Sequence, residues 1–357
     1  IVGTRGIPAK YGGFETFAQE LCTRLVRNGI QCVVYADRDS YFENTFEGVD
    51  IVFLKVTKSE NPLRYYYESL KSAIKTCDII YVTGTGGAIF YPILKRGKKK
   101  IITNTDGIEY ARDKWSFLKK IFIRLTEYFA VHYSDIIIAD SLGIKNYLLK
   151  KYKINSEKIW QIEYGAYINN HKDENVLKEY NILDNDYYLI ISRLEPENNI
   201  QMMIDGYIKC KSKKPLIIVG NININNKYIS NLLTAKCDNI RFIGGIYDPQ
   251  KLRALRTTCF AHIHGHSVGG TNPSLLEALG SGNVILAHDN IYNKQVGGDD
   301  IFYFKNSNEL CSVIKKNELM NDNARNIIAD NVRNRIINYY NWESITKRYI
   351  DNFKIII

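Results

Sequence analysis

Several features that mark common classes of protein are missing from this sequence of 357 residues. No apolar run is long enough to span a bilayer, which argues against a membrane-spanning helix. The seven cysteines are scattered, odd in number and free of C-x-x-C spacing, so neither a disulfide framework nor a zinc site is indicated, and a reducing cytosol is favoured. No nucleic-acid-binding motif is present, and we expect no nucleic-acid partner.

The usual glycine-rich signatures of nucleotide cofactor sites are missing as well. The segment 3–16, GTRGIPAKYGGFET, follows the first expected strand, but it matches neither the G-x-G-x-x-G nor the G-x-x-x-x-G-K-[ST] pattern. A nicotinamide cofactor or ATP is therefore disfavoured. Arg5, Lys10 and the backbone N–H groups of Gly12 and Gly13 still offer positive charge and hydrogen-bond donors to an anionic ligand.

Positive charge is in surplus, with a net charge of +10, and it is unevenly placed. Residues 1–165 hold 25 Lys and Arg against 18 Asp and Glu, and the densest cluster is KRGKKK at 95–100. The segment 114–124, KWSFLKKIFIR, mixes bulky apolar residues with cations at helical spacing, which suits an anionic membrane surface. The alternative is a solvated basic face over a buried apolar stripe.

Short apolar runs alternate with helical patterns along the whole chain, which predicts an α/β protein with doubly wound parallel sheets. The length suits two domains. We expect strands in the first half at 32–35, 51–54, 79–82, 101–104, 136–139 and 159–162, and in the second half at 187–192, 216–219, 240–243, 260–263, 284–287 and 301–304.

The expected domains are a Rossmann-like domain at 1–168 and a second at 169–335, which begins with a polar linker at 169–186. A helical segment at 336–357 is expected to pack back on the first domain. Two such domains would face a cleft at the carboxyl ends of both sheets, which is where ligands bind in folds of this class.

The run 264–282, HGHSVGGTNPSLLEALGSG, is the most informative stretch. It predicts a strand end, a glycine-rich turn at 269–270 and a helix that begins at Pro273. The first N–H groups of that helix, at 274–276, have no intrahelical acceptors, and the positive end of the helix dipole would stabilise a diphosphate there. Glu277, further along the helix, is placed to accept hydrogen bonds from sugar hydroxyls. An ordinary strand-to-helix connection is the alternative.

Two further segments follow expected strands. Asp106 and Glu109 place carboxylates where either can accept a hydrogen bond from an acceptor hydroxyl, although an Asp-Gly turn with a glutamate at a helix start would also explain them. Arg193 can form paired charge-assisted bonds to a diphosphate, or a structural salt bridge to a nearby carboxylate.

Together, these segments resemble the retaining GT-B glycosyltransferases (family 4-like), and in particular a bacterial rhamnosyltransferase-like branch that acts in surface-polysaccharide biosynthesis. The resemblance is carried by GTRGIPAKYGGFET (3–16), NTDGIEYARDKW (104–115), SRLEPENNI (192–200), HGHSVGGTNPSLLEALGSGNVILA (264–287) and WESITKRY (342–349). These segments span nearly the whole chain in the expected order.

The resemblance implies a role for each matching residue. Arg193 and Asp106 would be catalytic, with Arg193 neutralising the leaving diphosphate and Asp106 near the reacting centre. Lys10, Tyr11 and Glu109 would bind the acceptor. The implied donor-binding residues are Gly12, Gly13, Asn198, His266, Gly270, Thr271, Asn272, Pro273, Ser274 and Glu277, with Glu277 on the ribose. His264 and His266 would line the same cleft, or either would be a buried, neutral histidine.

Two positions depart from the family pattern. Many members have a glutamate eight positions before the one at Glu277, where this chain has Gly269, and a lysine shortly after the arginine, where this chain has Asn198. Sugar recognition would then use other groups. Arg5, Lys10 or Lys294 would replace the missing cation, and the sequence does not choose among them.

The resulting hypothesis is retaining transfer of a hexose, with L-rhamnose from dTDP-rhamnose as first choice, to a hydroxyl of a lipid-linked or saccharide acceptor. Arg193 and the helix start would stabilise the leaving diphosphate, so we expect neither a metal nor another cofactor. The protein would lie in the cytoplasm, at the inner face of the cytoplasmic membrane. The alternatives are a UDP- or GDP-hexose donor, an epimerase or phosphorylase of the same fold, and a non-catalytic sugar-nucleotide-binding partner protein.

Overall fold

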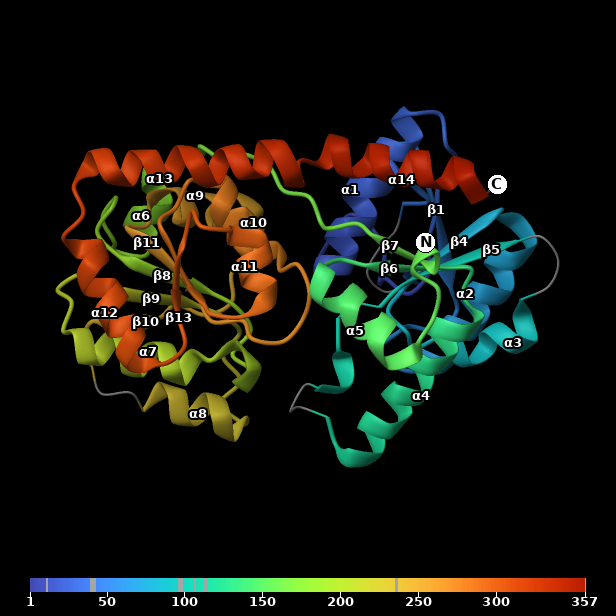
Figure 1. Cartoon of the computed structure of the whole chain (residues 1–357), viewed down its shortest axis with the longest axis horizontal. Helices are drawn as coiled ribbons and strands as arrows, with labels where there is room; N and C mark the ends of the chain where they lie inside the picture. The colour runs from blue at the N-terminus through green and yellow to red at the C-terminus, as the bar shows by residue number, and fades with distance from the viewer. Residues whose placement is uncertain are drawn as a thin grey trace. The chain divides into compact units, whose positions relative to one another are not determined.

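The computed structural model describes residues 1–10, 12–38, 43–95, 99–105, 107–111, 115–234 and 237–356. The chain forms two compact units, the first made of Ile1–Tyr164 with Trp342–Ile357 and the second of Gly165–Asn341 (Figure 1). The boundaries expected from the sequence lie a few residues from these. The segment 169–186, expected to be a linker, instead packs within the second unit, because its apolar residues Val176, Leu177 and Ile182 join the core there.

The first unit contains a mostly parallel sheet. Its strands are β1 (Val33–Asp37), β2 (Thr45–Phe46), β3 (Val49–Leu54), β4 (Ile79–Thr83), β5 (Lys100–Asn104), β6 (Ile136–Ala139) and β7 (Ile159–Gln161). The strand orders are β1-β3-β2 and β4-β5-β6-β7. The first two residues join these sets, because Val2 bridges to Val82 of β4 and the N–H of Tyr35 in β1 donates to the carbonyl of Ile1. Strand order therefore reverses between residues 1–2 and β4.

The helices of the first unit are α1 (Gly13–Arg27), α2 (Pro62–Thr76), α3 (Tyr91–Leu94), α4 (Phe117–Tyr133), α5 (Leu142–Tyr152) and α14 (Trp342–Ile356). The last of these confirms that the C-terminal segment packs on the first domain. Tyr349 of α14 lies 5.8 Å from Phe17 of α1 between ring centroids, and its hydroxyl lies 3.1 Å from that of Tyr81. Arg348 adds an ion pair of 2.7 Å to Glu163.

The second unit has one six-stranded parallel sheet in the order β10-β9-β8-β11-β12-β13. The strands are β8 (Tyr188–Ile191), β9 (Leu216–Val219), β10 (Ile240–Phe242), β11 (Ala261–His264), β12 (Ile285–His288) and β13 (Phe302–Phe304). Numbered within this unit, the order is 3-2-1-4-5-6, which is the Rossmann arrangement. The order reverses between β8 and β11.

Helices cover both faces of this second sheet. They are α6 (Glu174–Glu179), α7 (Ile200–Cys210), α8 (Lys227–Leu233), α9 (Pro249–Thr258), α10 (Pro273–Gly280), α11 (Ile291–Gly297), α12 (Ser307–Glu318) and α13 (Asp322–Arg335). Alternate residues of β8 belong to different cores: Ile190 packs with α7 and α12, whereas Leu189 packs with α6 and α9. This division confirms the doubly wound architecture.

Each strand expected from the sequence is present, with ends that differ by one or two residues. The strand that sequence reasoning missed is β2, which has two residues and pairs antiparallel with β3. Two residues are too few to show the alternating pattern on which strand prediction depends. Among the described helices, none combines the length and the hydropathy needed to cross a membrane.

Candidate functional site

The predicted donor motifs meet at the point where the second sheet reverses its strand order. In such sheets the loops that leave the two neighbouring strands diverge, and ligands bind in the crevice outside the carboxyl ends. Here the segment 192–199 follows β8 and the segment 265–272 follows β11, and the two strands are direct neighbours. The structure therefore brings the Arg193 segment and the start of α10 to one edge of the sheet, as predicted.

Direct hydrogen bonds hold these two loops together. The N–H and hydroxyl of Ser267 donate to the carbonyl of Glu197 at 3.1 and 2.8 Å, and the side-chain amide of Asn199 donates to the carbonyl of Gly265 at 2.7 Å. A Cβ at Gly265 would lie 2.2 Å from the carbonyl oxygen of Asn198, so only glycine allows this approach. The loops thus form one preformed surface.

Arg193 and Asn198 have different positions on that surface. The Arg193 side chain is 57% exposed and lies 3.5 Å from Glu195, so it has a nearby carboxylate and is also accessible to a ligand. Asn198 is buried and donates its side-chain amide to the carbonyl of Arg193 at 2.7 Å. At the position of the family lysine, this chain therefore has a residue that holds the arginine loop from inside.

Helix α10 begins at Pro273, as predicted from the sequence, but the hydrogen bonds of its first N–H groups differ from the prediction. Asn272 caps the helix: its Oδ1 accepts from the N–H of Ser274 at 2.9 Å, and its carbonyl accepts from the N–H groups of Leu275 and Leu276, each at 3.1 Å. The expectation that the N–H groups at 274–276 lack acceptors is therefore wrong, because the capping residue occupies all three. The helix dipole still places positive potential at this end.

Sequence reasoning missed a buried arginine beside this helix. Arg256, in the last turn of α9, is 5% exposed and pairs with Oε2 of Glu277 at 2.5 Å. It also lies 3.4 Å from the hydroxyl of Ser274, which donates to the carbonyl of Ile191 at the end of β8 at 3.2 Å. The Glu277 side chain is 47% exposed, so its free side remains open to solvent. Arg256 thus orients the carboxylate expected to bind ribose.

The signal for Arg256 was present in the sequence. Leu252, Leu255, Arg256 and Cys259 have the spacing of one helix face, and an arginine on an apolar face is unusual unless it has a buried partner. The pattern did not indicate which carboxylate that partner would be.

The histidines of β11 and its loop form a column from the core outward. The ring centroids of His262 and His264 are 6.2 Å apart, and those of His264 and His266 are 5.7 Å apart. Burial lowers the pKa of His262 well below its usual value and that of His264 to about 3, with neighbouring positive groups adding to both shifts. His262 and His264 are therefore buried and neutral, which was the alternative for His264. His266 is half-buried in the loop, and its carbonyl accepts from Asn290 at 2.8 Å.

The other departure from the pattern of the family that the sequence resembles, Gly269, has a structural explanation. Gly269 has φ +133°, a conformation that side-chain-bearing residues rarely adopt, although no atom of the described residues beyond its chain neighbours lies within 4 Å of where its Cβ would be. Restoring the family glutamate would therefore strain the backbone. Lys294, one candidate for the missing cation, lies 2.7 Å from Asp289.

In the first unit, the loop before α1 is fixed by side chains of that helix. Glu15 is buried and its Oε1 accepts from the backbone N–H of Arg5 at 2.8 Å, while Gln19 accepts from that of Ala9 at 2.8 Å. Lys10 is exposed, and Gly12 is the exposed, extended N-cap residue that precedes α1. Gly13 is the first residue of α1, and Tyr11 lies outside the described residues.

Of the two carboxylates predicted near the acceptor, the structure describes one. Glu109 accepts a hydrogen bond from the indole N–H of Trp115 at 3.0 Å, and Asp106 lies outside the described residues. Sequence reasoning also missed a glycine-rich loop at 84–87, which follows β4 at the strand reversal of the first sheet. Its signal was the GTGG run after a strand, and Cβ atoms at Gly86 and Gly87 would lie 2.9 and 2.7 Å from the Tyr66 ring.

In the ranges that the structure covers, no three His, Cys, Asp or Glu side chains gather where they could hold a metal ion. Asp37, the last residue of β1, forms an Asp-x-Asp pair with Asp39. Asp37 is buried and accepts from the N–H of Lys58 at 2.8 Å, and Asp39 lies outside the described residues.

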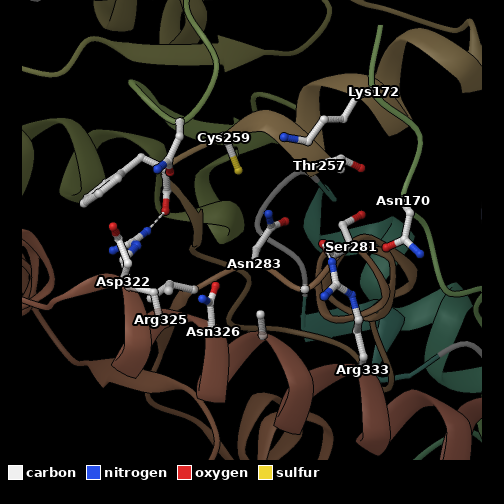
Figure 2. Close-up of a pocket in the computed structure, with 15 residues that line it drawn as sticks. Asn170, Lys172, Thr257, Cys259, Ser281, Asn283, Asp322, Arg325, Asn326 and Arg333 are labelled. Carbon is white, nitrogen blue, oxygen red and sulfur yellow. Dashed lines mark hydrogen bonds between the residues drawn. The ribbon is translucent and has the colours of Figure 1, made fainter.

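A separate cavity of about 520 Å³ lies at the opposite, amino-terminal edge of the second sheet (Figure 2). Two arginines that line it hydrogen-bond to other residues of the second unit. Arg325 donates to Asn317 at 2.8 Å, and Arg333 donates to the carbonyl of Ser281 at 3.1 Å. These bonds hold α13 to α12 and to the turn that follows α10. Because ligands of such sheets bind at the carboxyl edge, this cavity is not the candidate site.

Known proteins that this chain is similar to include glycosyltransferases. The family model described as "Domain of unknown function (DUF1972)" matches residues 1–167. The uncharacterized glycosyltransferase MJ1069 of Methanocaldococcus jannaschii is 26% identical over 284 residues, which covers 74% of this chain and 70% of the relative.

Solved structures share the whole architecture. A glycosyltransferase of Rickettsia africae ESF-5 matches with a TM-score of 0.73 at 16% identity, over 98% of this chain and 97% of that chain. Anabaena HepE in complex with UDP and glucose matches with a TM-score of 0.77 at 16% identity, over 98% of both chains. The chain therefore has the GT-B fold, which confirms the expected fold class, and it is similar in sequence and in structure to glycosyltransferases.

Proposed function

We propose that this chain, an enzyme of the glycosyltransferase class with the GT-B fold, transfers a hexose with retention from a nucleotide diphosphate sugar to an acceptor hydroxyl. The observation that carries the proposal is the meeting of an accessible Arg193 with the capped, positive end of α10 at the strand reversal of the second sheet. That edge combines an exposed cation with Glu277, whose carboxylate is half exposed.

The proposed reaction places these groups as follows. The bond between the anomeric carbon and the diphosphate oxygen breaks, and a bond to the acceptor oxygen forms on the same face. A diphosphate oxygen takes the proton of the acceptor hydroxyl. Arg193 and the α10 dipole stabilise the charge that develops on the leaving diphosphate, and electrostatic stabilisation of this kind is commonly the largest catalytic effect. Because these groups supply the positive charge, the proposal includes neither a metal nor another cofactor.

Glu277 is proposed to accept hydrogen bonds from the ribose hydroxyls of the nucleotide. Its ion pair with Arg256 supports this role, because a carboxylate held from one side loses less conformational freedom when a ligand binds on the other. His266, Gly270 and Thr271, in the loop before the helix, are proposed to contact the donor from the same edge.

For the donor, L-rhamnose from dTDP-rhamnose is the first choice, supported by the similarity of segments 192–200 and 264–287 to the rhamnosyltransferase-like branch. A UDP-hexose is the second candidate, because the similar Anabaena protein was solved with UDP and glucose. The acceptor is proposed to be a lipid-linked or saccharide hydroxyl in cell-surface polysaccharide synthesis. The enzyme would work at the inner face of the cytoplasmic membrane, consistent with the positive surplus of residues 1–165.

A thermal-shift panel tests the donor site. The dTDP, UDP and GDP forms of the nucleotides and their sugars are compared on the wild type, on Glu277→Ala, and on Glu174→Ala as a matched control far along the chain with an 88% exposed side chain. Ligand at one hundred times its dissociation constant should stabilise the wild type by about 2.7 kcal/mol. Glu277→Ala should lose most of this shift and the control should keep it.

Turnover separates an enzyme from a binding protein. Release of nucleotide diphosphate should require both donor and acceptor, and Arg193→Ala should lower the rate more than it lowers donor affinity. If the nucleotide sugar binds but no nucleotide diphosphate is released, and Arg193→Ala changes only the donor affinity, the chain is a non-catalytic sugar-nucleotide-binding protein. The proposal is then wrong.

A further inference from the structure

The outward face of α4 is unusually apolar. This helix packs on the first unit through Thr126, Glu127, Ala130 and Val131. Between residues 117 and 128, its large exposed apolar side chains are Phe117, Leu118, Ile121, Phe122, Leu125 and Tyr128, which range from 37% to 77% exposed. Their spacing of three or four residues places them on one side of the helix. The sequence alternative, an apolar stripe buried beneath a basic face, is therefore wrong for this segment, because these apolar residues face outward.

Positive charge flanks this face of α4, and the helix has no exposed negative charge. Lys119 and Arg124 are exposed and Lys120 is half-buried, whereas Glu127, the one carboxylate of this fully described helix, is 2% exposed. The Lys119 ammonium lies 3.8 Å from the centroid of the Trp115 ring. Cations beside aromatic and aliphatic side chains are the composition of helices that lie in a membrane interface.

Buried contacts hold α4 in this orientation. The Oε1 atom of Glu127 accepts from the Tyr147 hydroxyl at 2.7 Å, from the Lys151 ammonium at 2.7 Å and from the Tyr152 hydroxyl at 2.5 Å, all on or next to α5. The apolar face thus belongs to a helix that is anchored from beneath. The neighbouring helix α3, which contacts α4, also has an exposed apolar side chain, Ile93.

We propose that this face, the α4 surface (Phe117, Leu118, Ile121, Phe122, Leu125 and Tyr128 with Lys119, Lys120 and Arg124), docks on an anionic lipid bilayer. The apolar side chains enter the boundary between head groups and acyl chains, and the cations contact anionic head groups. A second copy of the chain is a poorer occupant, because a two-fold pairing of this face would bring the three cations of each copy together. The inference extends the proposed membrane location and does not depend on which sugar is transferred.

Vesicle flotation of the full chain, without donor or acceptor, tests the proposal. Vesicles of phosphatidylcholine alone are compared with vesicles that also contain phosphatidylglycerol. The test variant is Phe117→Gln/Leu118→Gln/Ile121→Gln, which keeps good helix formers on the surface. The matched control is Leu183→Gln/Ile224→Gln/Leu319→Gln, which changes three apolar side chains of the second unit that are each at least 70% exposed.

The wild type and the control should bind the anionic vesicles, more weakly at high salt. The test variant should bind at least about a hundredfold more weakly, because full burial of one such side chain is worth roughly a factor of ten. Replacing Lys119, Lys120 and Arg124 by Gln should abolish the preference for anionic over neutral vesicles.

Three outcomes would overturn the proposal: no vesicle binding by the wild type at low salt, unchanged binding by the test variant, or a wild-type dimer that the test variant converts to a monomer without any vesicle binding. Thermal melting of each variant checks that the fold is intact. A chain that floats with vesicles but transfers no sugar would refute the proposed function and leave the α4 surface standing. Transfer to a soluble acceptor by the test variant should continue at the wild-type rate.

Discussion

Glu277→Ala is expected to destabilise the second unit more than Arg256→Met does, although both changes break the same ion pair. The two partners differ in burial: the Arg256 side chain is 5% exposed and the Glu277 side chain is 47% exposed. Removing the glutamate leaves a buried guanidinium with the Ser274 hydroxyl at 3.4 Å as a weak remaining partner. Removing the arginine leaves a carboxylate that water already reaches.

The magnitudes follow from that difference. An uncompensated buried charge costs about 3–5 kcal/mol, and because water can enter where Glu277 is removed, we expect a loss of about 2 kcal/mol for Glu277→Ala. A half-exposed carboxylate that loses its partner costs about 0.5–1 kcal/mol, and methionine fills most of the arginine volume in Arg256→Met. The double variant leaves no buried charge at this pair, so its loss should be about 1.5 kcal/mol smaller than the sum of the single losses.

The assay must report on the second unit. All three tryptophans, Trp115, Trp160 and Trp342, lie in the first unit, so tryptophan fluorescence would report mainly on that unit. Urea unfolding followed by hydrogen exchange in peptides that cover α9 and α10 gives the free energy of unfolding locally. Equal losses for the two single variants, or losses that add to within about 0.5 kcal/mol in the double variant, would refute the reasoning.

Three other outcomes can be checked on the same protein. Asn272→Ala removes the cap of α10 and should cost about 1 kcal/mol in chemical unfolding, whereas Asn272→Asp should stay near the wild type. Burial lowers the pKa of His264 from 6.5 to about 3, so the unfolded chain binds more protons between these values. Stability should therefore fall by up to about 1.4 kcal/mol per pH unit for this residue as pH drops below 6.5, and His264→Phe should flatten the profile; a pH-independent wild type would contradict this. Gly265→Ala should lower the melting temperature far more than Gly12→Ala, because the new Cβ would approach a carbonyl oxygen to 2.2 Å in the first case and its nearest neighbour to 3.6 Å in the second; similar melting temperatures would count against the close approach of the two loops.

Much of the local structure at the proposed donor site could be predicted because its signals are local. Asn272 and Pro273 specify a helix start wherever they stand, since the side chain caps and the ring presets φ. Short apolar runs specify strands, and the loops that follow strands carry the motifs, so Arg193 and Glu277 could be assigned to one edge of one sheet. The hydrogen bonds that occupy the N–H groups at 274–276 were not predicted, because an Asn-Pro start signal does not by itself show which N–H groups the capping residue accepts from.

The sequence by itself determined the order of strands and helices, the division into two similar halves and the placing of the site loops after strands, because each of these depends on neighbours along the chain. The tertiary structure alone decided which side of each helix faces inward. Arg256 lies on an apolar face that is buried against Glu277, whereas Phe117 and Leu118 lie on an apolar face that is left exposed. The physical reason is that periodicity shows where a face lies on a helix, while only packing between distant segments determines what covers it.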